Sequence, residues 1–230
     1  MVKTFSGVDH VSALLVPYGS TFQTALGTTA RIFGVSAAAL APDLSTLLLL
    51  CDRGEIFEAT VAFGNRSISF SSLSWQDRRE LLARDRNGKP ITLDAEGLTV
   101  AGSQVFVSTE PSRLFRLPDW ASAPWKRPAG PLEAQLLAHQ PSEYFAGELP
   151  NQGLEALTSP RTKEAVTSIV TGIEGPLVQD DPRVRRVLEV DAASGKLLRS
   201  QFFLLDEAEG GVPQLLLSEI AALDAEGLAG

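Results

Sequence analysis

The sequence predicts an all-β fold: a β-propeller-like array of four-stranded antiparallel blades, with about three full blades, the start of a fourth and an incomplete ring. Two observations carry this prediction. First, one phrase occurs three times at a spacing of about sixty residues. It consists of a small and apolar run, a short turn, and a second apolar run that ends on an acid. Second, short apolar runs between turn residues, which are typical of strands, dominate the chain.

The three copies of the phrase mark successive units. The first copy runs from Gly34 to Arg53, the second from Asp94 to Glu110, and the third from Asn151 to Glu174. The hexapeptide Leu-Asp-Ala-Glu-Gly-Leu also occurs twice, at 93–98 and at 223–228. Its second occurrence falls in a turn of the predicted fourth unit, so we interpret this identity as coincidence.

The blades follow one another within a single domain that spans 1–230. We predict them at 33–75, 91–139 and 153–205, with the start of the next at 213–223. Their strands are short and bounded by turn residues, as in the Ser-Gly turn before Lys196.

Two short helical segments are predicted outside the strands. Residues 75–86 are charged and contain a pair of leucines, which favours a short surface helix, and residues 142–147 favour a single helical turn.

Composition excludes several classes of protein. The chain of 230 residues has 28 acidic residues against 20 Lys and Arg, a net charge of −8, so it lacks the basic balance of a nucleic-acid binder. No apolar run is long enough for a membrane span. A single cysteine, Cys51, excludes an internal disulfide framework. The short apolar run at 11–16 does not match a signal peptide, so the chain as written is expected in the cytoplasm.

Acidic residues recur at matching positions of the copies. Glu96 and Glu155 lie in first strands, whereas Asp52, Glu110 and Glu174 lie at the ends of second strands. Because first strands line the channel of a propeller, we expect these side chains to converge at one mouth. Carboxylates gathered in this way suit a hard cation such as Ca²⁺, or act as general acid and base with separated pKa values.

The alternative is that each acid caps a turn or pairs with a neighbouring arginine, such as Arg53 or Arg113, and has a structural role only. Other chemistry has no support in the sequence. There is no Gly-x-Ser-x-Gly phrase, no phosphate-binding loop and no Cys/His spacing typical of zinc.

The ordered set of phrases resembles the phytase-like β-propeller family, also described as "esterase-like activity of phytase". The resemblance rests on residues 94–98, 108–115, 151–157, 174–177 and 218–223, which occur in the family's order. Family members are longer, so the chain resembles a truncated or divergent member. Such an open ring would leave two sheet edges exposed, and we expect self-association through them.

The resemblance implies a hydrolase that acts on a small-molecule phosphoester or ester at the acid-lined channel, assisted by Ca²⁺. Its catalytic groups or metal ligands would be Glu96, Glu110, Glu155 and Glu174, and Asp52 with Arg53 would contact the substrate. The alternative is a non-catalytic propeller that binds a ligand or a protein, or an inactive truncated relic. The resemblance is also compatible with a periplasmic or secreted protein.

Overall fold

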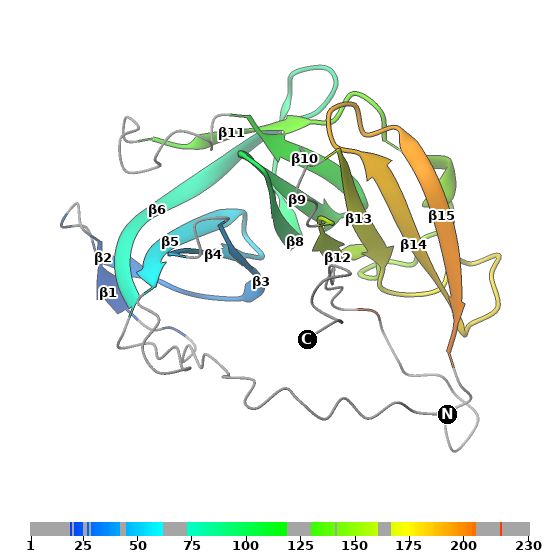
Figure 1. Cartoon of the computed structure of the whole chain (residues 1–230), viewed down its shortest axis with the longest axis horizontal. Helices are drawn as coiled ribbons and strands as arrows, with labels where there is room; N and C mark the ends of the chain where they lie inside the picture. The colour runs from blue at the N-terminus through cyan, green and yellow to red at the C-terminus, as the bar shows by residue number, and fades with distance from the viewer. Residues whose placement is uncertain are drawn as a thin grey trace, which may run out of the picture.

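The computed structural model shows an all-β chain (Figure 1). It describes residues 19, 21–24, 27, 29–41, 45–61, 73–118, 130–140, 142–160, 167–205 and 217. The predicted fourth unit at 213–223 lies outside the described residues except for Leu217, whose N–H donates to the carbonyl of Glu174 at 3.0 Å. Among the described residues, no helix has the length and apolarity that crossing a lipid bilayer requires.

Three four-stranded antiparallel arrays follow one another along the chain, as the repeat predicted. The first blade consists of β3 (Val35–Leu40), β4 (Thr46–Cys51), β5 (Glu55–Val61) and β6 (Leu73–Arg84). The second consists of β8 (Asp94–Ala101), β9 (Gln104–Glu110), β10 (Arg113–Leu117) and β11 (Leu132–Leu136). The third consists of β12 (Leu154–Thr158), β13 (Ser168–Ile173), β14 (Val184–Asp191) and β15 (Leu197–Leu204).

Smaller elements complete the described fold. The hairpin of β1 (Thr21–Gln23) and β2 (Thr29–Arg31) forms a sheet of its own, and β7 (Pro90–Ile91) pairs with the end of β6. The predicted turn at 142–147 is present as the 3₁₀ turn η3 (Ser142–Tyr144) and the turn residues after it.

The predicted helix at 75–86 is wrong, because this segment belongs to β6. Every second side chain of β6 except Asp77 is buried, as Leu73, Trp75, Leu81 and Ala83 illustrate, which is the period of a strand. The strand has partners far away in the sequence: β5 pairs with its first part, and β11 pairs in parallel with its residues 81–83. These long-range ladders outweigh the local helical preference of the charged residues.

The parallel pairing of β6 with β11 joins the first two blades. It connects their outermost strands, so that both blades and β7 form one nine-stranded sheet. The third blade remains a separate four-stranded sheet. The first strands of the three blades come together at the centre of the molecule, where β8 packs against both β3 and β12 (Figure 1).

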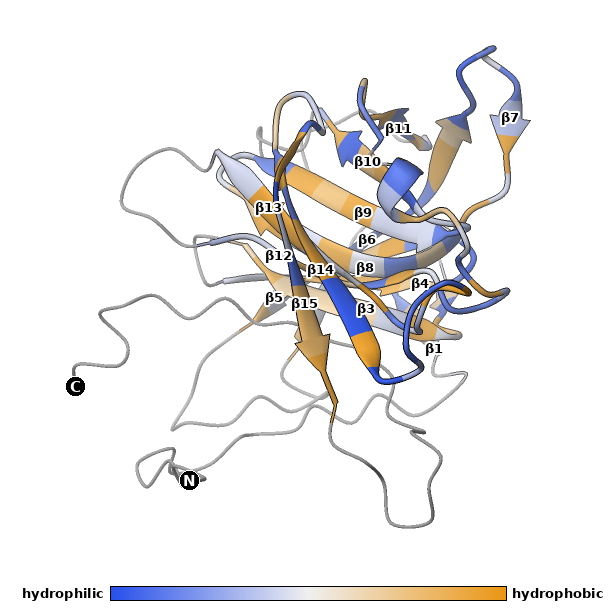
Figure 2. Ribbon diagram, turned by 90° about the vertical axis from the view of Figure 1, so that its right-hand side faces the viewer, coloured by the Kyte–Doolittle hydropathy of each residue, from blue (hydrophilic) through white to orange (hydrophobic). Residues whose placement is uncertain are grey.

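Apolar side chains fill the space between the blades. One cluster lies between the first two blades and includes Leu48, Leu98 and Phe115, and a second lies between the last two and includes Phe106 and Ile169. The outer strand β15 differs: its end is apolar (Figure 2), and the side chains of Phe202, Phe203 and Leu204 there are exposed. Burial on both sides of β8 and β9 therefore fixes the first strands of the second and third blades against each other.

Candidate acidic site

A β-bulge at the same place in each first strand shapes the centre of the molecule. The register shifts between Val35 and Ala37 in β3, between residues 95 and 97 in β8, and between residues 154 and 156 in β12. The extra residues are Ser36, Glu96 and Glu155. A bulge re-aims the side chain of its extra residue, and here the repeated phrase places that residue equivalently in all three blades.

The ends of the second strands supply a second set of equivalent residues. Glu110 ends β9, Glu174 follows β13 and Asp52 follows β4. The backbone repeats as well: the N–H of Asp52 donates to the carbonyl of Gly34 at 2.9 Å, and the N–H of Glu174 donates to that of Gly153 at 2.8 Å. The structure thus has one acid at this position in each blade.

Three of these carboxylates lie close together. Oxygen atoms of Glu110, Glu155 and Glu174 all lie within 4.8 Å of one another. Glu110 comes from the second blade, whereas Glu155 and Glu174 come from the third. We call these three residues the acidic triad. Glu96 lies next to it, because the charges of Glu155 and Glu110 both act on its carboxyl group.

The site favours the protonated form of these acids. Burial, followed by the neighbouring charges of Glu174, Glu110 and Asp94, raises the pKa of Glu155 to about 7. Burial also raises the pKa of Glu96 to about 7, helped by Glu155 and Asp94, although a hydrogen bond with Ser36 opposes this change. At neutral pH both groups therefore exist partly protonated and partly ionised.

The pKa values of Glu110 and Glu174 are also raised. Burial raises the pKa of Glu110, and the N–H of Gly153, which donates to its Oε1 at 2.5 Å, partly offsets this. Burial and Glu110 raise the pKa of Glu174, whereas the guanidinium of Arg185 lowers it. Arg185 is only 2% exposed and donates to the carbonyls of Pro182 and Val184.

A pocket of about 370 Å³ opens beside the triad. Glu110 belongs to both, and the other lining residues include Asp94, Glu148 and Gly153. Glu148 accepts a hydrogen bond from the N–H of Ser112 at 3.2 Å. A molecule that enters this pocket therefore meets a carboxylate of the triad directly.

The structure does not place every predicted residue in the site. Glu110, Glu155 and Glu174 form the triad and Glu96 lies beside it, but Asp52 and Arg53 do not contribute to it. Asp52 is half-buried against Gly34, and Arg53 is exposed. The first blade instead contributes Ser36 through its bulge.

Sequence reasoning missed Ser36, Asp94 and Glu148. Ser36 occupies the repeat position of Glu96 and Glu155, and the alignment of the three phrases could have found it. Asp94 lies at the start of the second phrase. Glu148 gives no signal in the repeat, because it lies in the connection between the second and third blades.

Comparison with models of protein families matches residues 30–229 to the family described as phytase-like, "esterase-like activity of phytase". The chain belongs to this family. The resemblance carried by the ordered phrases is thereby confirmed, and the phytase-like match covers all three blades and the acidic triad. None of the curated proteins matches the chain.

Two solved structures are among those similar to this phytase-like chain. The structure of the Dos1 propeller shares 13% identity with a TM-score of 0.39, over 81% of this chain and 43% of that chain. BamB from Moraxella catarrhalis shares 12% identity with a TM-score of 0.40, over 82% of this chain and 48% of that chain. The chain spans less than half the length of either structure.

Proposed function

We propose that the chain is a hydrolase domain that binds a divalent cation such as Ca²⁺ at the acidic triad and cleaves a phosphoester or ester in the adjoining pocket. The observation that carries the proposal is the convergence of Glu110, Glu155 and Glu174, from two blades, within 4.8 Å. Membership of the phytase-like family supports the class of reaction.

The donor set fits a hard cation. Carboxylate oxygens are the ligands that Ca²⁺ prefers, and the three groups are close enough to share one ion. Gly153 leaves room there, since a Cβ atom at this position would lie 3.2 Å from the Cγ of Glu110. A bound cation would supply Lewis-acid polarisation of a phosphoryl or carbonyl oxygen and would lower the pKa of bound water.

The protein's own groups supply proton transfer and anchoring. A carboxyl group whose pKa is about 7 exchanges protons readily at neutral pH, so Glu96 can act as general acid or base beside the triad. The Ser36 hydroxyl stabilises the ionised form of Glu96. Burial and Glu110 raise the pKa of Glu174, and the guanidinium of Arg185 partly opposes this rise by favouring the ionised form.

The proposal is tested by measuring binding and turnover separately. Calorimetry with Ca²⁺ should show one site in the parent chain and none in Glu155→Gln or Glu110→Gln. Hydrolysis of 4-nitrophenyl phosphate and 4-nitrophenyl acetate should require Ca²⁺ and should be lost in the same variants. Glu96→Gln should retain the cation while losing most of the turnover.

Glu143→Gln is the matched control, because it removes the same charge from an exposed position on η3. It should leave binding and turnover unchanged. If Ca²⁺ binds at the triad but neither ester is cleaved, the hydrolase half of the proposal fails and a non-catalytic module stabilised by a cation remains. If Ca²⁺ does not bind at pH 8, the whole proposal fails.

A further inference from the structure

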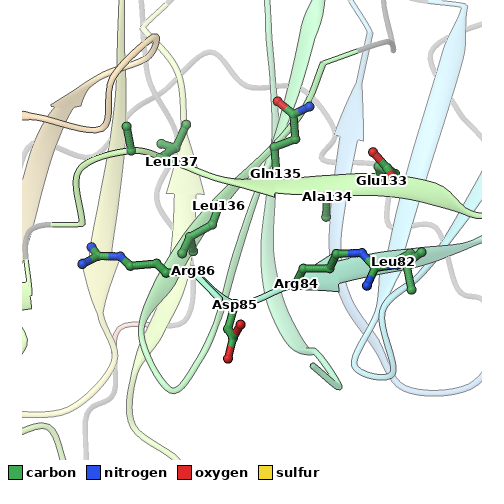
Figure 3. Close-up of a pocket in the computed structure, with 10 residues that line it drawn as sticks. Leu82, Arg84, Asp85, Arg86, Glu133, Ala134, Gln135, Leu136 and Leu137 are labelled. Atoms are coloured by element: carbon green, nitrogen blue, oxygen red, sulfur yellow. The ribbon is translucent and has the colours of Figure 1, made fainter. Parts of the chain in front are cut away.

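A second pocket, of about 500 Å³, lies between the outer strands of the first two blades (Figure 3). Residues 82, 84–86 and 133–138 line it, and none of these lines the pocket beside the acidic triad. The acidic triad comes from strands of the second and third blades, whereas this pocket belongs to β6, β11 and the segments that follow them. The proposed hydrolytic site does not account for it.

The pocket exists because two paired strands separate. β6 and β11 run parallel until Ala83 pairs with Ala134. Beyond this pair β6 turns into a hairpin with β7, closed by the N–H of Asp85 donating to the carbonyl of Lys89 at 2.9 Å. β11 continues alongside β10. The two strands thus form a fork, and we call the space between them the fork pocket.

The fork presents a backbone donor that faces no strand of the described part of the chain. The N–H of Leu137 donates to the carbonyl of Leu114 on β10 at 3.0 Å. Successive residues of a strand direct their amide groups to opposite edges, so the N–H of Leu136 is directed toward β6. The ladder with β6 has already ended at Ala134. The Leu136 amide therefore faces the fork pocket.

Two guanidinium groups flank the pocket (Figure 3). Arg84 donates to the carbonyl of Gly88 at 3.0 Å, which holds it within its own hairpin. Arg86 is exposed, and among the described residues it makes no hydrogen bond or ion pair. Its charge is thus available to a ligand.

The two acids of the lining are directed elsewhere. Asp85 points away from β11 (Figure 3) and accepts the N–H groups of Asn87 and Lys89, at 2.8 and 2.9 Å. Glu133 extends from the opposite side of β11 to Ala134 and Leu136 (Figure 3). The side of the pocket between the strands therefore combines positive charge with apolar side chains.

We propose that the fork pocket binds a small organic anion with a carboxylate head and an apolar chain. A guanidinium and a free amide together suit a carboxylate, since both donate hydrogen bonds to its oxygens. Leu136 and Ala134 offer the apolar chain a surface, and a pocket of this size is typical of small-molecule sites. The hydrogen-bond donors alone would equally suit an inorganic anion, and the apolar surface alone would equally suit a neutral apolar molecule. Together they favour an anion with an apolar chain.

The test is a titration of the ¹⁵N-labelled chain with octanoate, acetate and inorganic phosphate, followed by amide chemical shifts. Octanoate should shift the Leu136 amide and the amides of 84–86, and should bind more tightly than acetate or phosphate. Arg86→Gln should weaken octanoate binding by about five- to tenfold, the effect of one exposed charge-assisted hydrogen bond.

Lys196→Gln is the matched control, because Lys196 is an exposed cation outside the pocket. It should leave the dissociation constant of octanoate unchanged. Equal weakening by Lys196→Gln would reveal general charge attraction and would overturn the proposal. Unchanged binding in Arg86→Gln, shifts confined to other strands, or phosphate binding as tightly as octanoate would each overturn it as well.

Discussion

Glu155 is one of two acids in the site whose pKa is raised to about 7. It lies at a bulge, it is half-buried, and Glu174, Glu110 and Asp94 all act on it. A carboxylate in such surroundings costs free energy when it ionises without a partner cation. The folded chain therefore holds a proton on this residue at a pH at which the unfolded chain has already lost it.

This difference predicts a pH-dependent stability. The pKa of Glu155 in the folded chain is about 7, above its ordinary value of 4.5. Its contribution to the stability of the fold is therefore fully present below pH 4.5 and is lost as the pH rises through 7. In the presence of EDTA, Glu155→Gln should therefore raise the unfolding temperature more at pH 8 than at pH 5. Thermal unfolding followed by circular dichroism at both pH values measures this gain.

The Glu143→Gln chain should show no such trend, since its carboxylate is exposed. At pH 8, Ca²⁺ should make the unfolding temperature of the parent chain higher than that of Glu155→Gln, because only the parent chain gains the bound ion. An equal change in unfolding temperature at both pH values would contradict the raised pKa.

At the scale of strands, β8 is confined most tightly at Gly97. A Cβ atom there would lie 2.6 Å from the backbone oxygen of Glu155 and 2.7 Å from the Cβ of Leu157, and it would also collide with the Ser108 hydroxyl. The glycine thus permits β8 and β12 to approach each other next to the bulge that carries Glu96.

Gly97→Ala should consequently separate β8 from β12. We expect a loss of about 2 kcal/mol in the free energy of unfolding, typical of overpacking in a core, measured by urea denaturation. Ca²⁺ affinity should fall as well, because Glu110 and Glu155 come from the two blades that the substitution pushes apart. Adding Ser108→Ala should restore only part of the stability, since the contacts with residues 155 and 157 remain. Full recovery in the double variant would mean that Ser108 alone sets the spacing.

The repeat explains which strand-level features the sequence could predict. Acids at matching positions predicted that Glu96, Glu110, Glu155 and Glu174 would come together, because equivalent strands in successive blades have equivalent orientations. The contribution of Ser36 was missed, since a hydroxyl replaces the acid at that position. The strand β6 was predicted as a helix at 75–86, because its partners β5 and β11 are not apparent from local residues.

At the scale of the whole molecule, the acidic triad spans a boundary between sheets. Glu110 belongs to the nine-stranded sheet, Glu155 belongs to the four-stranded one, and Glu174 directly follows a strand of the latter. Among the described elements these two sheets share no ladder, and packed side chains hold them together with a few hydrogen bonds, such as that from the Ser159 hydroxyl to the carbonyl of Val100 at 3.0 Å. A cation at the triad would therefore add an ionic link to the packing and hydrogen bonds between the two sheets.

The parallel ladder between β6 and β11 has a consequence for how the chain opens. A ladder transmits cooperativity, so the first two blades should exchange their amide hydrogens as one foldon, and the third as another of lower opening free energy. Native-state hydrogen exchange in low denaturant should give the amides of β4 and β9 the same opening free energy and those of β14 a smaller one. Saturating Ca²⁺ should raise the opening free energy of β14 toward that of β4 and β9. One common opening free energy without Ca²⁺ would contradict this prediction and show that the contacts between the sheets already make the three blades a single cooperative unit.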